Sequence, residues 1–173
     1  LHLVGDKCYE QPLERDGFVL AFNGFISNSK ELCAIHNLVV QDRGGDTAEL
    51  FELLYTFGTT ILPQLKGMFT FIFFNKHSNL IIIARDTQGI KPLHYTVIDD
   101  CIIFSSEAQP IFKSGLVEKK LNKDAIQNIL ENRYVNGSDT IFDGIKNFEC
   151  GHFCELSLDN PKIELRSFNY ESS

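Results

Sequence analysis

The sequence predicts an α+β fold of two stacked, mainly antiparallel sheets covered by outer helices, and three observations predict it. Short β-branched and aromatic runs, separated by turn residues, recur along the chain. Helical patterns appear at several separate points between them. The paired runs GMFTFIFF and LIIIARD are apolar at nearly every position, which is typical of strands buried on both faces.

The first elements follow from local signals. A strand is expected from Phe18 to Phe22, and the Asn23-Gly24 pair after it is interpreted as a turn. Ser29 is expected to cap a short helix that reaches Ile35.

The next helix begins at an acidic residue. Asp46 is expected to cap it, Glu49 to reach back three residues, and Gly58 to end it after Phe57. A shorter helix is expected over residues 61–65.

The remaining elements are mostly hairpins. Their expected positions are a hairpin over residues 67–86 that turns at 75–79, strands at 93–98 and 101–104, a short helix from Ser106, a longer helix capped by Asn122, and a last hairpin over 152–168 that turns at 159–161.

Composition excludes several classes of protein. A net charge of -7 and the lack of a basic stripe argue against nucleic-acid binding. The apolar runs are far shorter than the roughly 20 residues that a membrane-spanning helix needs. The odd number of cysteines and the lack of a CxxC pair favour reduced thiols and a cytoplasmic location. Cys150, His152 and Cys154 lack a fourth ligand, so no metal site is expected.

Eight short motifs follow one another in register along nearly the whole chain. They are Gln11-Pro12-Leu13, LAFNGxIxN from Leu20, Gly45-Asp46-Thr47-x-Glu49, GMFxF from Gly67, ARDxxGIKPL from Ala84, SSE from Ser105, TIFxGIK from Thr140, and Gly151-His152. Together they resemble the amino-terminal glutaminase domain of asparagine synthetase, a class II (N-terminal nucleophile) glutamine amidotransferase.

The resemblance implies a four-layer α-β-β-α sandwich of the N-terminal nucleophile hydrolase type. It implies one domain over residues 1–173, without the family's N-terminal strand and ending before a synthetase domain. The family's nucleophile is an amino-terminal Cys, whereas this sequence begins at Leu1, and Cys8 lies away from the nucleophile's position. We therefore expect residues 1–173 to be inactive alone.

The same resemblance assigns the pocket residue by residue. Asn23, through its side-chain amide, and Gly24, through its backbone N–H, would form the oxyanion hole. Asp46 would receive the α-ammonium group of glutamine, and the backbone of Leu3 and Val4 would hold its carboxylate.

Phe25 departs from the family pattern. The family usually reads NGEIYN where this chain reads NGFISN, and the Glu helps to bind the substrate amine. A benzyl group cannot pair with an ammonium group as a carboxylate does, so we expect a weak glutaminase or none. The alternative is that Phe25 only packs against a rearranged loop.

The parent protein would hydrolyse glutamine and pass ammonia to an ATP-dependent amidation site. No cofactor is expected in this domain, because ATP and Mg²⁺ would bind a separate synthetase domain, which is the expected partner. The resemblance also allows a homodimer of the parent. A second hypothesis is a degenerate scaffold or docking domain, favoured by Phe25. A phosphoribosylamine-forming enzyme fits the motifs less well.

Overall fold

The computed structural model describes residues 11–40, 45–133 and 137–168. The chain forms two compact units, one made of Leu1–Lys91 with Cys150–Ser173 and the other of Pro92–Glu149. Each unit contains one antiparallel sheet and helices, so the expected α+β class is confirmed. The predicted site residues Leu3 and Val4 lie outside the described residues.

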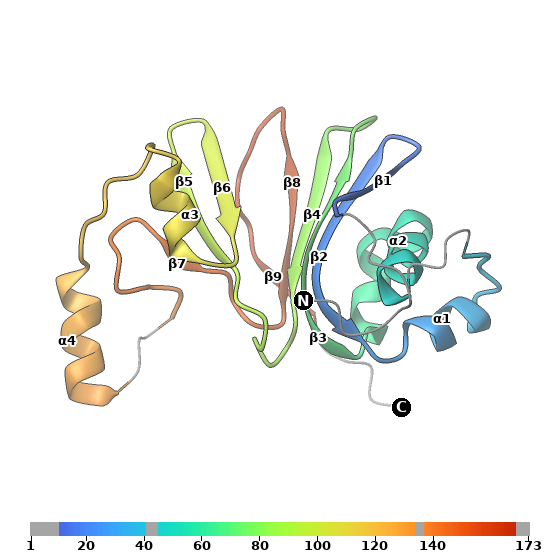
Figure 1. The fold of residues 1–173 in the computed structure, drawn as a ribbon, viewed down its shortest axis with the longest axis horizontal. Helices are drawn as coiled ribbons and strands as arrows, with labels where there is room; N and C mark the ends of the chain where they lie inside the picture. The colour runs from blue at the N-terminus through green and yellow to red at the C-terminus, as the bar shows by residue number, and fades with distance from the viewer. Residues whose placement is uncertain (1–10, 41–44, 134–136, 169–173) are drawn as a thin grey trace. The chain divides into compact units, whose positions relative to one another are not determined.

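The first unit is built on a six-stranded sheet in the order β1-β2-β3-β4-β8-β9, in which every neighbouring pair is antiparallel. Figure 1 shows α1 and α2 together on one side of this sheet. The elements are β1 (Leu13–Arg15), β2 (Phe18–Ile26), α1 (Ser29–Ile35), α2 (Asp46–Phe57), the 3-10 helix η1 (Gly58–Gln64), β3 (Gly67–Asn75), β4 (Leu80–Arg85), β8 (His152–Ser157) and β9 (Arg166–Ser167).

The centre of this sheet is buried on both faces, as the apolar runs predict. Consecutive residues 69–71 of β3 and 82–84 of β4 are all buried, although neighbouring side chains of a strand point to opposite faces. On the α2 face, the hydrophobic core includes Leu20 and Phe22 of β2 with Leu50, Leu53 and Leu54 of α2.

The turn expected at Asn23-Gly24 is wrong, because β2 continues through both residues to Ile26. Strand β3 pairs with β2 along this whole stretch, as far as Ile26 opposite Gly67. An Asn-Gly pair favours a turn only when no partner strand extends the pairing.

Two expected helix caps are also wrong. The N-cap of α2 is Gly45, and Asp46 is the first helical residue. The N-cap of α1 is Asn28, whose side chain makes no capping hydrogen bond, and Ser29 is already helical. In both cases the polar side chain bonds to a distant segment, which a local cap rule cannot anticipate.

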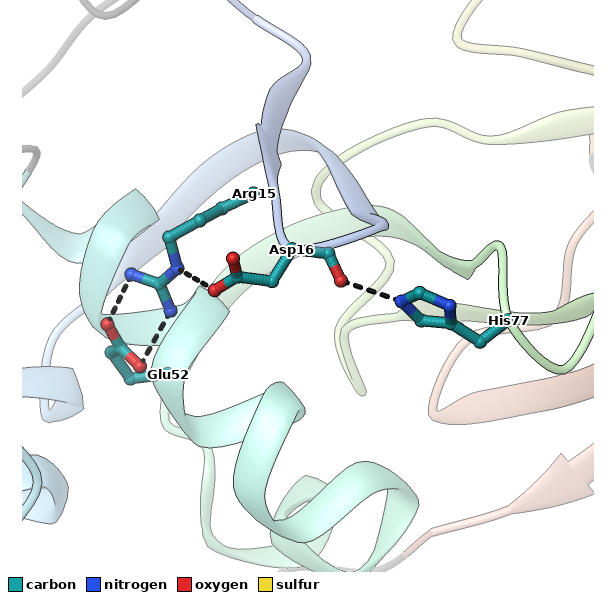
Figure 2. A network of polar contacts seen from close by, with 4 residues as sticks. All are labelled: Arg15, Asp16, Glu52 and His77. Carbon is teal, nitrogen blue, oxygen red and sulfur yellow. Dashed lines mark hydrogen bonds and ion pairs between the residues drawn. The ribbon is translucent and has the colours of Figure 1, made fainter.

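Arg15 joins β1 to α2 through a paired ionic contact (Figure 2). Its guanidinium donates to both carboxylate oxygens of Glu52, at 2.7 and 2.9 Å, and lies 4.6 Å from the centre of the Phe51 ring. The neighbouring Asp16 contacts Arg15 Nε at 3.6 Å, and the Asp16 carbonyl oxygen lies 2.9 Å from His77 Nε2. This network fixes the β1-β2 hairpin against the helix and against the β3-β4 turn.

The second unit contains a three-stranded sheet in the order β6-β5-β7. Its elements are β5 (His94–Ile98), β6 (Cys101–Ser105), α3 (Ala108–Lys113), α4 (Lys123–Asn132) and β7 (Lys146–Asn147). The β5-β6 hairpin and the Asn122 cap of α4 are confirmed, since Asn122 Oδ1 accepts the Ala125 N–H at 3.0 Å. No helix in the described parts of the chain is long and apolar enough to cross a membrane.

Candidate active site at the edge of strand β2

The predicted oxyanion residues lie near the end of β2, in extended backbone. Asn23 is paired with Thr70 and Gly24 with Phe69 of β3. Asn23 is exposed, whereas Gly24 and Phe25 are half-buried. Because side chains alternate along a strand, Asn23 and Phe25 lie on the face opposite to Phe22.

One backbone bond fixes the direction of every N–H group in this stretch. The Ser27 N–H donates to the Lys66 carbonyl oxygen, on the β3 side, at 2.8 Å. In an antiparallel ladder, alternate residues direct their N–H groups to opposite edges. The N–H groups of Phe22, Gly24 and Ile26 therefore point to the edge of β2 that faces away from β3.

Strand β1 covers only part of that edge, since its pairing with β2 ends at Leu13 opposite Leu20. Beyond Leu13, two described side chains accept N–H groups along this edge. Gln11 Oε1 accepts the Phe22 N–H at 2.7 Å, and Asp46 Oδ2 accepts the Ile26 N–H at 3.0 Å. Between these two bonds, the Gly24 N–H has no acceptor within residues 11–40, 45–133 and 137–168.

Gly24 has to be glycine because β3 approaches closely. A Cβ atom at this position would collide with the Met68 carbonyl oxygen and lie 2.7 Å from the Cα atom of Phe69. Both obstacles are backbone atoms that cannot rotate away. The close pairing of β2 with β3 therefore requires glycine at position 24.

Asp46 reaches this strand from the start of α2. Burial raises the pKa of the Asp46 carboxyl above its ordinary value, the Ile26 N–H opposes that rise, and the nearby Glu49 carboxylate adds to it. Glu49 does not reach back to the helix start as expected, because its Oε2 accepts the Ser29 hydroxyl at 2.6 Å. Two carboxylates thus lie close to the end of β2, and their charge favours a cationic ligand group.

The chain that leaves β2 is held by a second side-chain clamp. Asn28 donates through Nδ2 to the Gln64 carbonyl oxygen and accepts the Lys66 N–H at Oδ1, each at 2.8 Å. These bonds fasten the end of β2 to the segment that precedes β3. Sequence reasoning assigned no role to Asn28 or Gln11, although both belong to the quoted motifs.

The loop that follows β4 is organised by a buried carboxylate. Asp86 is 0% exposed, and its oxygens accept backbone N–H groups at 3.0 to 3.3 Å. The donors are Phe69, Gln88, Ile90 and Lys91. Through Phe69, which is opposite Gly24, this carboxylate supports the strand that backs the site.

Two of the described cysteines are poorly suited to act as a nucleophile. Cys33 and Cys154 are buried. Burial, with the charges of Glu49 and Glu52, raises the pKa of the Cys33 thiol to about 11, and burial also raises the pKa of the Cys154 thiol. A high pKa disfavours the reactive thiolate. Cys8 lies outside the described residues.

A cavity of about 340 Å³ lies at the other end of β2. Its walls include Phe18 at the start of β2, Phe57 at the end of α2, and Glu155 of β8. Asn23 and Asp46 do not line it. It is therefore separate from the candidate site. Among the described residues, no group of three or more His, Cys, Asp or Glu side chains could hold a metal ion.

Comparison with known proteins identifies the family. The family model described as a glutamine amidotransferase domain matches residues 3–169. The chain belongs to this family of glutamine amidotransferase domains. Asparagine synthetase 2 (glutamine-hydrolyzing) of Bacillus subtilis strain 168 is 30% identical over 167 residues, which is 92% of this chain and 22% of that protein. Asparagine synthetase 1 of the same strain is 30% identical over 149 residues, covering 82% of this chain and 23% of that protein.

The expected resemblance to asparagine synthetases is thus confirmed, and the chain spans less than a quarter of the length of these two curated relatives. A solved structure of glutamine phosphoribosylpyrophosphate amidotransferase from B. subtilis has a TM-score of 0.61 at 20% identity, and covers 89% of this chain and 31% of its own. A structure described as the allosteric regulatory enzyme of purine biosynthesis has a TM-score of 0.63 at 21% identity, covering 94% of this chain and 32% of its own. At this identity, both likenesses show the fold alone.

Proposed function

We propose that this amidotransferase domain hydrolyses the side-chain amide of glutamine and supplies the ammonia to an amidation reaction. The observation that carries the proposal is the Gly24 N–H, which has no acceptor among the described residues. It lies between the Phe22 and Ile26 amides, which side chains accept, and next to Asn23. An oxyanion forms when a thiolate adds to the amide carbon of glutamine. A backbone N–H and a side-chain amide fixed at that position stabilise the charge.

In this proposal Asp46 receives the α-ammonium group of the substrate. Its position beside the end of β2 and the neighbouring Glu49 charge support that role. Leu3 and Val4 would hold the substrate carboxylate, as the family resemblance implies. Their role stays a proposal, because both lie outside the described residues.

The nucleophile would come from an amino-terminal Cys, as in the family. The free α-amine of that Cys takes the thiol proton, and the thiolate adds to the amide carbon. The proton passes to the leaving nitrogen, ammonia departs as the thioester forms, and water then hydrolyses the thioester to glutamate and restores the thiol. We propose that residues 1–173 alone do not complete this reaction. The raised pKa values of the buried Cys33 and Cys154 thiols, which make both poor nucleophiles, support this proposal. Cys150, an exposed thiol, lies beside Gly89 rather than Gly24.

The partner reaction belongs to the same proposal. The names of the relatives support an asparagine-forming synthetase domain, which would bind ATP and Mg²⁺ and accept the ammonia. This domain itself would need no cofactor. The free state of Cys33, Cys101, Cys150 and Cys154 supports a cytoplasmic location. A homodimer of the whole protein remains part of the proposal.

The test is glutamine hydrolysis by the full-length parent protein, called the native polypeptide from here on, followed as the glutamate and ammonia released. Asn23→Ala is expected to lower kcat about 100-fold to 1,000-fold with little change in KM. Lys30→Ala, an exposed change on α1, serves as the matched control and is expected to leave kcat unchanged. Equal turnover in Asn23→Ala and the wild type would refute the oxyanion assignment.

A second candidate function is a docking domain that has lost catalysis, and Phe25 favours it. This side chain lies on the same strand face as Asn23, in the position where the family pattern has an amine-binding Glu. A native polypeptide that neither binds glutamine in calorimetry nor releases glutamate would support the docking function.

A further inference from the structure

Gln11 lies just beyond the point where the described pairing of β1 with the edge of β2 ends. The last β1 pair before the gap is Leu13 opposite Leu20, so continuing the register would place residue 11 opposite Phe22. The side chain of Gln11 takes over at that point, and its Oε1 accepts the Phe22 N–H at 2.7 Å.

We infer that Gln11 is a positioning residue, which holds the edge of β2 so that the Gly24 N–H stays aimed at the reacting oxygen. The inference rests on the proposed glutaminase function. Gly24 follows Phe22 by two residues and directs its N–H to the same edge. On the β1 side of Gly24, the next N–H group along this edge is therefore that of Phe22, and the Gln11 side chain accepts it.

The two side-chain acceptors along this edge, Gln11 and Asp46, have different roles in the proposal. Asp46 holds the Ile26 N–H on the far side of Gly24 and also faces the proposed amine site. Gln11 is uncharged and makes its bond from the other side. Without it, water would accept the Phe22 N–H and the strand would be free to shift near Gly24. A displacement of about 1 Å at a reacting centre can lower a rate about 100-fold.

The geometry also explains why the side chain rather than the backbone makes this bond. Strand β1 begins only at Leu13, so the ladder provides no β1 carbonyl oxygen opposite the Phe22 N–H. A glutamine side chain offers an amide carbonyl oxygen, the same type of acceptor as a backbone carbonyl of a paired strand. A carboxylate would offer it too, whereas an alkyl side chain would not.

The experiment uses the native polypeptide and three variants. Gln11→Ala and Gln11→Leu remove the acceptor and differ in bulk, and Gln11→Glu keeps an acceptor oxygen. Glu14→Ala is the control, because Glu14 lies on the same hairpin but forms a surface ion pair with Lys76. The readouts are kcat and KM for glutamine, and amide hydrogen exchange in peptides that span residues 18–28.

Both acceptor-free variants are expected to lower kcat about tenfold, with KM within about twofold of the wild type. They should also speed exchange in the peptides that contain the Phe22 amide, whose acceptor has been removed. Gln11→Glu is expected to restore kcat and exchange protection to near the wild-type values. Glu14→Ala should change neither readout.

Unchanged exchange in the acceptor-free variants overturns the inference, and so does faster exchange with a wild-type kcat. If the wild type releases no glutamate, the proposed function has failed, and the exchange readout decides the inference by itself. Faster exchange that Gln11→Glu reverses then supports Gln11 as the residue that holds this edge, and unchanged exchange overturns it.

Discussion

Asp86→Asn exchanges one oxygen of a buried carboxylate for an NH₂ group, and the structure makes this a costly change. Asp86 Oδ1 accepts the N–H groups of Gln88 and Ile90 at 3.0 and 3.2 Å. Its Oδ2 accepts those of Phe69 and Lys91 at 3.2 and 3.3 Å. An Asn side chain keeps only one oxygen, so two of these four donors lose their acceptor whichever way the amide is turned.

The magnitude follows from these contacts. A hydrogen bond to a charged group contributes about 1.5 to 3 kcal/mol, and the new NH₂ group would also face two N–H donors. We therefore expect Asp86→Asn to lower the free energy of unfolding by about 3 to 5 kcal/mol. At about 2 to 4 °C for each kcal/mol, Tm should fall by about 6 to 20 °C.

The assay is urea unfolding of the native polypeptide, monitored by circular dichroism, with thermal unfolding as a second readout. Asp99→Asn is the control, since Asp99 is exposed in the β5-β6 turn, and it should change the free energy of unfolding by less than about 0.5 kcal/mol. An Asp86→Asn variant as stable as the control would show that the buried bonds contribute nothing net, and would refute the reasoning.

The remaining predictions concern the substrate amine and the β1 anchor. Phe25→Glu should lower the KM for glutamine about tenfold to a hundredfold, because a carboxylate regains a charge-assisted bond to the ammonium group, and an unchanged or higher KM would show that Phe25 only packs. Only an ionised Asp46 can bind an ammonium group, so the KM for glutamine should rise as the pH falls through the raised pKa of Asp46. Glu49→Gln removes one cause of that raised pKa and should move the rise in KM to lower pH. A pH profile of KM that is the same in the wild type and in Glu49→Gln would contradict this. Arg15→Leu should lower the free energy of unfolding by about 2 to 4 kcal/mol by stranding Glu52, which is 8% exposed, and adding Glu52→Leu should recover most of the loss in urea unfolding. A double variant no more stable than Arg15→Leu would contradict the pairing.

Local sequence signals were sufficient to predict an element where both interacting groups lie in the same short segment. The β3-β4 hairpin was predictable because both strands are apolar and a turn lies between them. The Asn122 cap was predictable because its acceptor and the Ala125 N–H are three residues apart. In such cases the pattern and the interaction lie within the same short window of sequence.

Local signals failed where a distant segment competes for the same group. Asp46 has the sequence of a helix cap, but its carboxylate bonds to Ile26, 20 residues earlier. Asn23-Gly24 has the sequence of a turn, but β3 keeps it extended. Neither partner can be identified without the register of the sheet, which depends on the whole fold.

The candidate site shows the same division. The motifs predicted Asn23, Gly24 and Asp46 as site residues, because a match of residue types to the family pattern can be seen in the sequence itself. Only the direction of the Ser27 N–H revealed which edge of β2 the Gly24 N–H faces. The proposed role of Gln11 likewise needed the structure, because a sequence motif does not show that its side chain accepts the Phe22 N–H.

The contacts that position the Gly24 N–H do not depend on the Phe25 side chain, and this allows an experiment to distinguish the two proposed functions. The bonds that frame the Gly24 N–H come from Gln11 and Asp46 to backbone groups on either side of it, and neither involves the Phe25 side chain. The fit of Gly24 against β3 likewise depends on backbone atoms of Met68 and Phe69. Under the proposed glutaminase function, we therefore expect Phe25 to raise the KM for glutamine while leaving the oxyanion donor and kcat unchanged. A domain whose catalysis had been lost through this residue would instead show a fall in kcat that Phe25→Glu reverses, and that result would mean that Phe25 acts through the strand backbone.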